Sequence, residues 1–132
     1  MAYLIDTDIL IYNIKGNLKV AQHFVERQDI PKSISIITYG ELLYGAKKSK
    51  QTGKNSAIVY RLAEIFPIIG ISRPIIETFA DIKLTLEKEG ERVPDLDLLI
   101  AATALSLNYS LVTNNIRHFS RIAGLKIENW AE

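Results

Sequence analysis

The sequence predicts a three-layer α/β/α domain, in which helices cover both faces of a short central parallel sheet. Short apolar runs of strand length alternate along the chain with longer segments of helical periodicity. Strands that alternate with helices pair in parallel and need cover on both faces. The 132 residues suit a single hydrophobic core, and no repeat, low-complexity tract or linker divides them. We therefore expect one domain over residues 1–132.

The first half of the chain is expected to supply two strands and four helices. Tyr3–Ile5 is a brief apolar run typical of a buried strand. A break around Gly16 separates two helical segments, and Pro31 follows the second of them. A polar, lysine-rich connection over residues 49–54 separates two further helices. The expected strands are 3–5 and 33–37, and the expected helices are 7–14, 18–27, 38–48 and 56–65.

The second half continues the alternation. Gly90 is placed to end a long helix, and Pro94 to precede a shorter, very apolar one. The expected strands are 67–71, 111–113 and a short segment around 127, and the expected helices are 74–89 and 97–107.

Composition excludes several classes of protein. Apolar residues make up 48% of the chain and charged residues 23%, which is typical of a folded globular domain. The net charge of +1 names no partner, so any binding of nucleic acid must rest on a local patch. The absence of cysteine excludes disulfides, thiolate metal sites and a cysteine nucleophile, and fits a reducing cytoplasm.

No membrane or targeting segment is expected. The first strand runs directly into Asp6, unlike a signal peptide. The longest apolar run, residues 98–107, is far shorter than the roughly 20 residues of a membrane span. We expect a cytoplasmic protein with a buried helix at that position.

Polar side chains cluster where the predicted strands end. Ligands of open parallel sheets bind beyond the carboxyl ends of the strands, so the residues at these positions are the candidates for a site. They are Asp6 and Asp8 after the first strand, Thr38 and Glu41 after the second, Asp95 and Asp97 at the start of the apolar helix, and Thr113 and Asn115 after the fourth strand.

Taken singly, most of these residues have a local explanation. Asp8 could cap a helix, and Asp95 could do the same or complement a helix dipole. Thr38 and Glu41 have the spacing of a capping box, which is the better interpretation of Glu41 alone. Asp6 is hardest to explain in this way, because apolar segments on both sides predict that it is partly buried.

Taken together, the acids favour a metal site. Several carboxylates at one sheet edge repel one another and lose hydration, and a divalent cation removes that penalty. Oxygen ligands without thiolates favour magnesium or manganese, and His23 and His118 do not form the local pair that zinc would suggest. Such a site permits metal-assisted hydrolysis of a phosphodiester.

Four segments, in this order and spacing, make the chain resemble PIN-domain nucleases, and among them the VapC-type toxins of bacterial toxin–antitoxin pairs. They are residues 3–11 (YLIDTDILI), 36–45 (IITYGELLYG), 97–105 (DLLIAATAL) and 111–119 (LVTNNIRHF). Residues 124–130 (GLKIENW) resemble the family's last strand. The resemblance covers essentially the whole chain and implies a PIN-like fold and a metal-dependent endoribonuclease.

The resemblance also implies roles for individual residues. Asp6, Glu41 and Asp97 match the three acidic positions of the family site, with Asp6 and Asp97 touching the metal and Glu41 acting through water. Thr38 matches a hydroxyl position near the site. Asp8 is expected to contribute to the site without touching the metal.

The chain departs from the family pattern at one acidic position. Asn115 stands where many relatives have a fourth acid, and Asp95 either compensates or merely begins its helix. An amide binds a cation more weakly than a carboxylate. We therefore expect one firm metal site, and a second only when RNA phosphate helps to complete it.

The resemblance implies an RNA substrate, a cognate antitoxin and a homodimer. The candidate RNA contacts are the basic residues Lys47, Lys48, Arg117 and Arg121. Phosphate contacts of this kind supply affinity without sequence preference. The lysines could equally be a solvated loop. The apolar helices 38–48 and 56–65 have a surplus face that could bind an antitoxin helix or a second copy, or could belong wholly to the core.

Two other functions remain open. Asp6 and Asp8 after a strand superficially resemble the start of a phosphotransfer domain with an aspartate nucleophile, although the expected downstream lysine and acidic pair are missing. The second open function is that of a PIN-like module that binds a partner without catalysis. Phosphate-binding loops of the nucleotide-binding classes are absent from the sequence.

Overall fold

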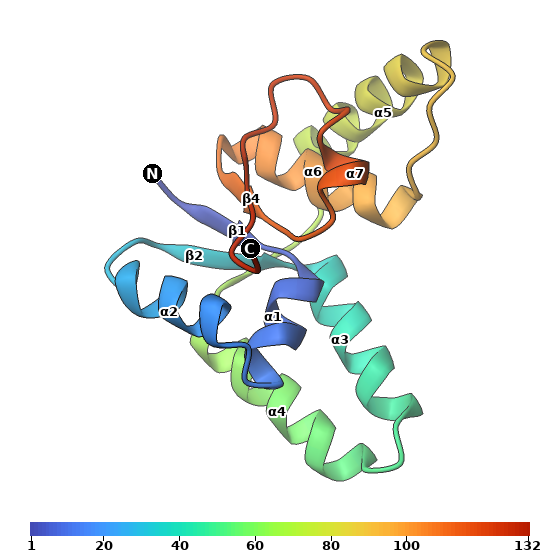
Figure 1. Cartoon of the computed structure of the whole chain (residues 1–132). Coiled ribbons are helices and arrows are strands. Elements are labelled where there is room, and N and C mark those ends of the chain that lie inside the picture. Colours follow the sequence, from blue (N-terminus) through green and yellow to red (C-terminus); the bar gives the residue numbers. More distant parts are fainter.

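A five-stranded parallel sheet lies at the centre of the computed structural model, which describes residues 1–132 (Figure 1). The strands are β1 (Tyr3–Ile5), β2 (Lys32–Ser35), β3 (Ile68–Ile69), β4 (Ser110–Val112) and β5 (Ile127–Glu128). Their order is β3-β2-β1-β4-β5, and every neighbouring pair is parallel. β1 is therefore central, and its end lies between the ends of β2 and β4.

Helices cover both faces of this sheet. They are α1 (Thr7–Ile14), α2 (Leu18–Glu26), α3 (Ile36–Lys48), α4 (Thr52–Ile65), α5 (Arg73–Lys88), α6 (Asp95–Leu107) and α7 (Ile116–Phe119). Side chains of β1 alternate between two cores: Tyr3 and Ile5 pack with α1 to α4, and Leu4 packs with α5 to α7. Figure 1 shows the two groups of helices on opposite sides of the sheet. The predicted three-layer fold is confirmed.

The start of α3 differs from the prediction. Ile36 and Ile37 were expected in a strand but form the first turn of the helix, because Ser35 caps it by accepting a hydrogen bond from the Ile37 amide at 3.0 Å. The capping-box interpretation of Thr38 and Glu41 is therefore wrong. Thr38 lies inside α3 and is fully buried.

Two other helices start earlier than predicted, and one helix was not predicted. α4 begins at Thr52, so part of the expected polar connection is helical. α6 begins at Asp95, with Pro94 at the cap position, and Asp95 makes no capping bond. The short helix α7 was not expected, because four residues are too few to show a periodicity.

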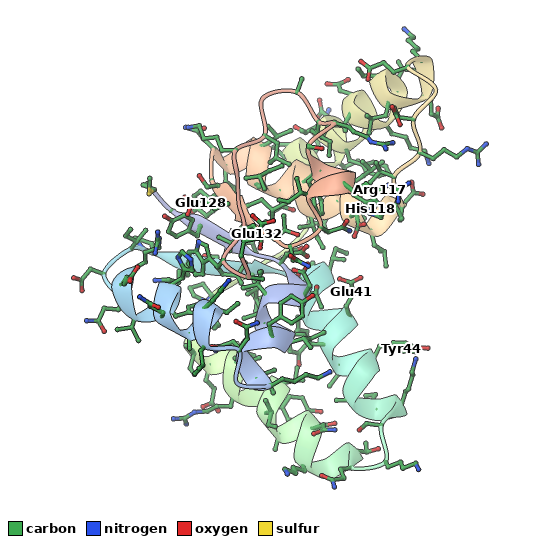
Figure 2. The ribbon with its side chains drawn as sticks, in the orientation of Figure 1. Glu41, Tyr44, Arg117, His118, Glu128 and Glu132 are labelled. Carbon is green, nitrogen blue, oxygen red and sulfur yellow. The ribbon has the colours of Figure 1, made fainter.

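The α3–α4 hairpin extends beyond the sheet edge (Figure 1). Its outer part presents aromatic side chains to solvent, and Tyr44 is 66% exposed and points away from the body of the domain (Figure 2). The apolar residues of these two helices therefore do not all belong to the core. None of the helices is both long and apolar enough to cross a membrane.

Candidate active site

Asp6 is the buried centre of the site. It follows β1 directly and is only 6% exposed, and its Oδ1 caps α1 by accepting a hydrogen bond from the Thr7 amide at 2.8 Å. Its Oδ2 accepts a hydrogen bond from the Thr113 hydroxyl at 2.7 Å, across from the end of β4. Burial, reinforced by the charge of Asp8, nevertheless raises the pKa of Asp6 to about 7. Two hydrogen bonds thus do not fully offset the cost of charging this carboxyl group.

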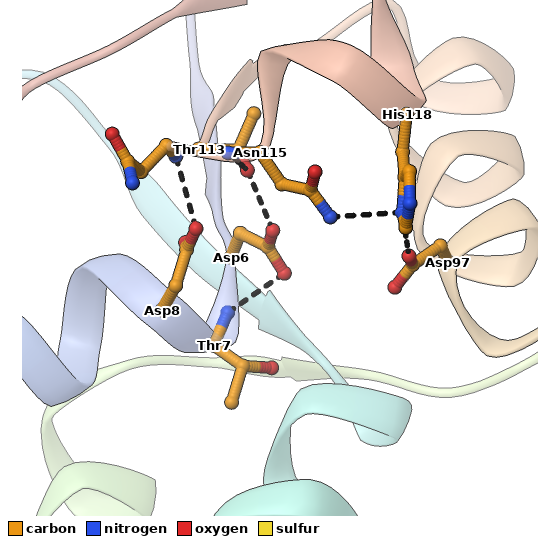
Figure 3. Close-up of polar contacts among 8 residues, drawn as sticks. Asp6, Thr7, Asp8, Asp97, Thr113, Asn115 and His118 are labelled. Carbon is orange, nitrogen blue, oxygen red and sulfur yellow. Dashed lines mark hydrogen bonds and ion pairs between the residues drawn. The ribbon is translucent and has the colours of Figure 1, made fainter. Parts of the chain in front are cut away.

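Asp8 lies beside Asp6 in the first turn of α1 (Figure 3). Capping of this helix was one interpretation of Asp8, but Asp6 has that position. Asp8 instead accepts hydrogen bonds from the Ile9 amide at 2.7 Å and from the Asn114 amide at 3.0 Å. Burial raises its pKa as well. Asp8 therefore ties the loop after β4 to α1 and adds negative charge next to Asp6.

Glu41 reaches the site through a pair of threonines. Its Oε1 accepts a hydrogen bond from the Thr7 hydroxyl at 2.7 Å. The same hydroxyl lies 3.2 Å from the Thr38 hydroxyl. Glu41 is therefore held against α1, one turn along α3 from Thr38, and does not cap its own helix.

Asp97 enters the site from the opposite side, in the first turn of α6 (Figure 3). Its Oδ2 lies 2.8 Å from Nδ1 of His118, on α7. The same Nδ1 lies 2.9 Å from the Asn115 side-chain nitrogen. Nothing in the sequence placed His118 in the site, yet its side chain is only 35% exposed and contacts Asp97 and Asn115.

Thr113 and Asn115 shape the edge of the site after β4. The Thr113 hydroxyl donates a hydrogen bond to Asp6 and accepts one from the backbone N–H of Asn115 at 2.9 Å. This arrangement fixes the backbone that carries both side chains. Both residues thus lie where they were expected, on the side of Asp6 that faces β4.

Two residues that were expected near the site are engaged elsewhere. Asp95 is 58% exposed at its side chain and pairs with Lys83 of α5 at 3.0 Å. It therefore does not stand in for the fourth acid. Arg121 forms an ion pair with Glu91. Its charge is thereby partly committed within the protein.

The other basic candidates form no ion pair within the protein, although Lys48 lies over the ring of Tyr44. Lys47 and Lys48 are exposed in the last turn of α3, remote from the residues that open this helix. Arg117 is exposed on α7, next to His118 (Figure 2). The loop after β4 thus brings one basic residue close to the acids, and α3 brings none.

The donor set fits a hard divalent cation. The charges of Asp8 and Asp97 help to raise the pKa of Asp6, and the charge of Asp97 also helps to raise that of Asp8. A cation between these groups would remove this repulsion. No three acidic or histidine side chains converge tightly enough to enclose an ion. Mg²⁺ commonly takes only one or two carboxylates and completes its coordination with water and phosphate oxygens. Asp6 and Asp97 can supply that number.

Sequence reasoning missed three contributors to the site. Thr7 holds Glu41, the Asn114 amide holds Asp8, and His118 contacts Asp97. Thr7 and Asn114 adjoin residues that were singled out, so their positions offered a signal. His118 offered only its spacing of three residues from Asn115, which places both on one side of a helical turn.

The chain belongs to the PIN domain family, whose profile matches residues 3–125. Within that family it is 36% identical to a ribonuclease VapC2 of Haemophilus influenzae, over 98% of each chain. It is 29% identical to a tRNA(fMet)-specific endonuclease VapC of Shigella flexneri, over 99% of each chain. The resemblance expected from the sequence is confirmed.

Solved structures agree with this assignment. The VapBC2 complex of Rickettsia felis bound to a promoter DNA fragment contains a chain with a TM-score of 0.92 and 33% identity, covering 98% of this chain and 99% of that one. The DNA-bound VapBC complex of Salmonella typhimurium gives a TM-score of 0.91 at 31% identity, with 98% of each chain covered. The fold is thus shared along almost the whole length.

Proposed function

We propose that this protein is a metal-dependent endoribonuclease and the toxin of a toxin–antitoxin pair. The observation that carries the proposal is the buried carboxyl group of Asp6, held at the end of the central strand with Asp8 on one side and Asp97 on the other (Figure 3). Burying like charges together costs free energy unless a cation binds between them. Relatives named ribonucleases or endonucleases over their full length support the choice of RNA as substrate.

Asp6 and Asp97 would hold a Mg²⁺ ion, or Mn²⁺ in its place. When bound, the ion lowers the pKa of a water molecule and neutralises charge on the phosphate. Thr113 keeps Asp6 oriented, and Thr7 keeps Glu41 oriented. Because Oε1 of Glu41 is engaged by Thr7, its Oε2 remains able to accept a hydrogen bond from water and orient it. Asn115 adds no charge, so a second ion would depend on the RNA phosphate.

Arg117 is the basic residue best placed to contact the RNA backbone. It is exposed and two residues from Asn115, whereas Lys47 lies nine residues along α3 from Thr38, or about 14 Å at 1.5 Å per residue. Lys47 and Lys48 would meet only RNA that extends along the hairpin. Arg121 would first have to leave Glu91. Arg117 should therefore contribute most to binding.

An apolar groove between α1, α3 and α4 would receive the antitoxin. Its volume is about 360 Å³, and it runs from Glu41 of the site toward the start of α4. Its apolar lining residues are Ile11, Ile14, Leu42, Ala46, Ile58 and Val59. An amphipathic segment in this groove would end next to the carboxylates and block them. The neighbouring solved structures are toxin–antitoxin complexes, which supports such a partner.

The exposed face of the α3–α4 hairpin would form a homodimer. Tyr44 and Tyr60 are both about half exposed or more on this hairpin, and aromatic side chains are enriched at protein interfaces. With an RNA substrate and a bacterial antitoxin, the protein would act in the cytoplasm.

The test is cleavage of RNA by the purified protein with and without Mg²⁺. We expect Mg²⁺-dependent cleavage by the wild type, none by folded Asp6→Asn, and normal activity in the matched control Asp81→Asn, whose side chain is exposed on α5. Full activity in Asp6→Asn would remove the assignment. No cleavage by the wild type would favour a PIN-like binding module, and a covalent aspartyl-phosphate would favour phosphotransfer.

A further inference from the structure

His118 is a side chain shared by two parts of the site. Its Nδ1 lies 2.8 Å from Oδ2 of Asp97 and 2.9 Å from Nδ2 of Asn115. Asp97 belongs to α6, and Asn115 belongs to the loop after β4, so the imidazole joins two segments that are separate in sequence (Figure 3).

The chemistry of these contacts fixes the direction of one hydrogen bond. An ionised carboxylate only accepts hydrogen bonds, so Nδ1 of His118 must carry a hydrogen and donate it to Asp97. The same nitrogen cannot also accept a hydrogen bond from the side-chain amide of Asn115. The oxygen and nitrogen of an amide are assigned from their surroundings, and here the amide oxygen fits the position facing Nδ1. Both neighbours then accept from one donor.

The backbone that carries the imidazole is held in place. Phe119, the next residue along α7, is fully buried in the core beneath α6. On its other side, His118 lines a cavity of about 900 Å³, whose floor includes Leu86 and Leu98. Phe119 therefore anchors the backbone of His118, and the His118 side chain borders both this cavity and Asp97.

We propose that His118 is a positioning residue, which orients the Asp97 carboxylate toward Asp6 for cation binding. This inference rests on the proposed metal site. The bond from Nδ1 occupies Oδ2 of Asp97, restrains rotation of the carboxylate and leaves Oδ1 for the ion. Hydrogen bonds of this kind to a metal ligand commonly change metal affinity or activity by about 10- to 100-fold.

Variants at this position can separate orientation of Asp97 from other roles. The side-chain nitrogen of Asn occupies the place of imidazole Nδ1, whereas that of Gln occupies the place of Nε2. His118→Asn therefore keeps the donor to Asp97, and both His118→Gln and His118→Ala remove it. Ser120→Ala is the matched control, because Ser120 is exposed and follows the same short helix.

The experiment measures Mn²⁺ affinity by electron paramagnetic resonance, with far-UV circular dichroism as a check on folding. We expect His118→Ala and His118→Gln to bind Mn²⁺ about tenfold more weakly than the wild type, and His118→Asn to stay within about threefold. Wild-type affinity in the Ala and Gln variants would overturn the proposal. If the Ala variant does not fold, the comparison of Asn with Gln decides.

A second readout separates this inference from the proposed function. If His118 contacted RNA instead, its variants would raise KM for cleavage and leave Mn²⁺ affinity unchanged, which would overturn the positioning role. If the wild type bound Mn²⁺ through Asp97 but cleaved no RNA, the ribonuclease proposal would fail. The role of His118 would then still be decided by the Mn²⁺ affinities.

Discussion

Replacing Asp6 by Asn should make the protein more stable at alkaline pH while it abolishes activity. The pKa of Asp6 is raised to about 7 in the folded protein, against a value of 3.8 in the unfolded chain. A carboxyl group with a raised pKa disfavours the folded state once it ionises, so its penalty is absent below pH 3.8 and grows until the pH passes about 7. Asn has nearly the same shape and never ionises.

The size of the effect follows from the shift. A difference of about three pKa units corresponds to a ceiling of about 4 kcal/mol, at about 1.4 kcal/mol per unit. Asn would keep the bond to the Thr7 amide but would disturb the bond with Thr113, at a cost of about 1–2 kcal/mol. The net gain in the free energy of unfolding at pH 8 should therefore be about 2 kcal/mol.

Urea unfolding in EDTA at pH 5 and pH 8 measures this gain for wild type, Asp6→Asn and the control Asp81→Asn. The advantage of Asp6→Asn over wild type should grow by about 2–3 kcal/mol between the two pH values. The control should show no such growth. An advantage that stayed constant with pH, or that shrank toward pH 8, would refute the argument from burial.

The remaining predictions concern single contacts. Thr7→Val should lower the rate of RNA cleavage about tenfold with little loss of stability, because Glu41 loses the hydroxyl group that holds it, and Thr7→Ser should restore the rate. Equal rates in Thr7→Val and wild type would exclude a role of Thr7 in orienting Glu41. In thermal unfolding, millimolar Mg²⁺ should raise the Tm of the wild type but not that of Asp97→Asn, and an equal rise in both would place the ion elsewhere. Arg117→Ala should weaken RNA binding and reduce its dependence on salt concentration, which titrations at two salt concentrations would show. Ser35→Ala should lower the free energy of unfolding by about 1 kcal/mol in urea titrations, through loss of the α3 cap.

The fold was largely predictable because periodicity and breakers are local signals. The strand at Tyr3–Ile5 and the helix at Thr7–Ile14 have the predicted bounds. Ile36 and Ile37 misled the prediction, because β-branched residues favour strands and the cap at Ser35 decided otherwise. At these two residues, a single side-chain hydrogen bond from the cap outweighed the local preference for a strand.

The site was predictable only where residues adjoin the end of a strand or the start of a helix. Asp6, Asp97 and Thr113 were found from their positions alone, and the structure places them around one point (Figure 3). Asp95 shows the limit of that reasoning, since Lys83 holds it away from the other acids. Contacts between residues distant in sequence depend on how the elements pack, which spacing does not encode.

The bond between Thr113 and Asp6 joins positions 107 residues apart. During synthesis, the central strand carrying Asp6 leaves the ribosome early and must wait for β4 before its carboxyl group has a partner. At about 5–20 residues per second, that delay lasts on the order of 5–20 s. A chain that has not yet reached β4 therefore lacks the hydroxyl group that orients the Asp6 carboxyl group, so the site can form only once nearly the whole chain has been made.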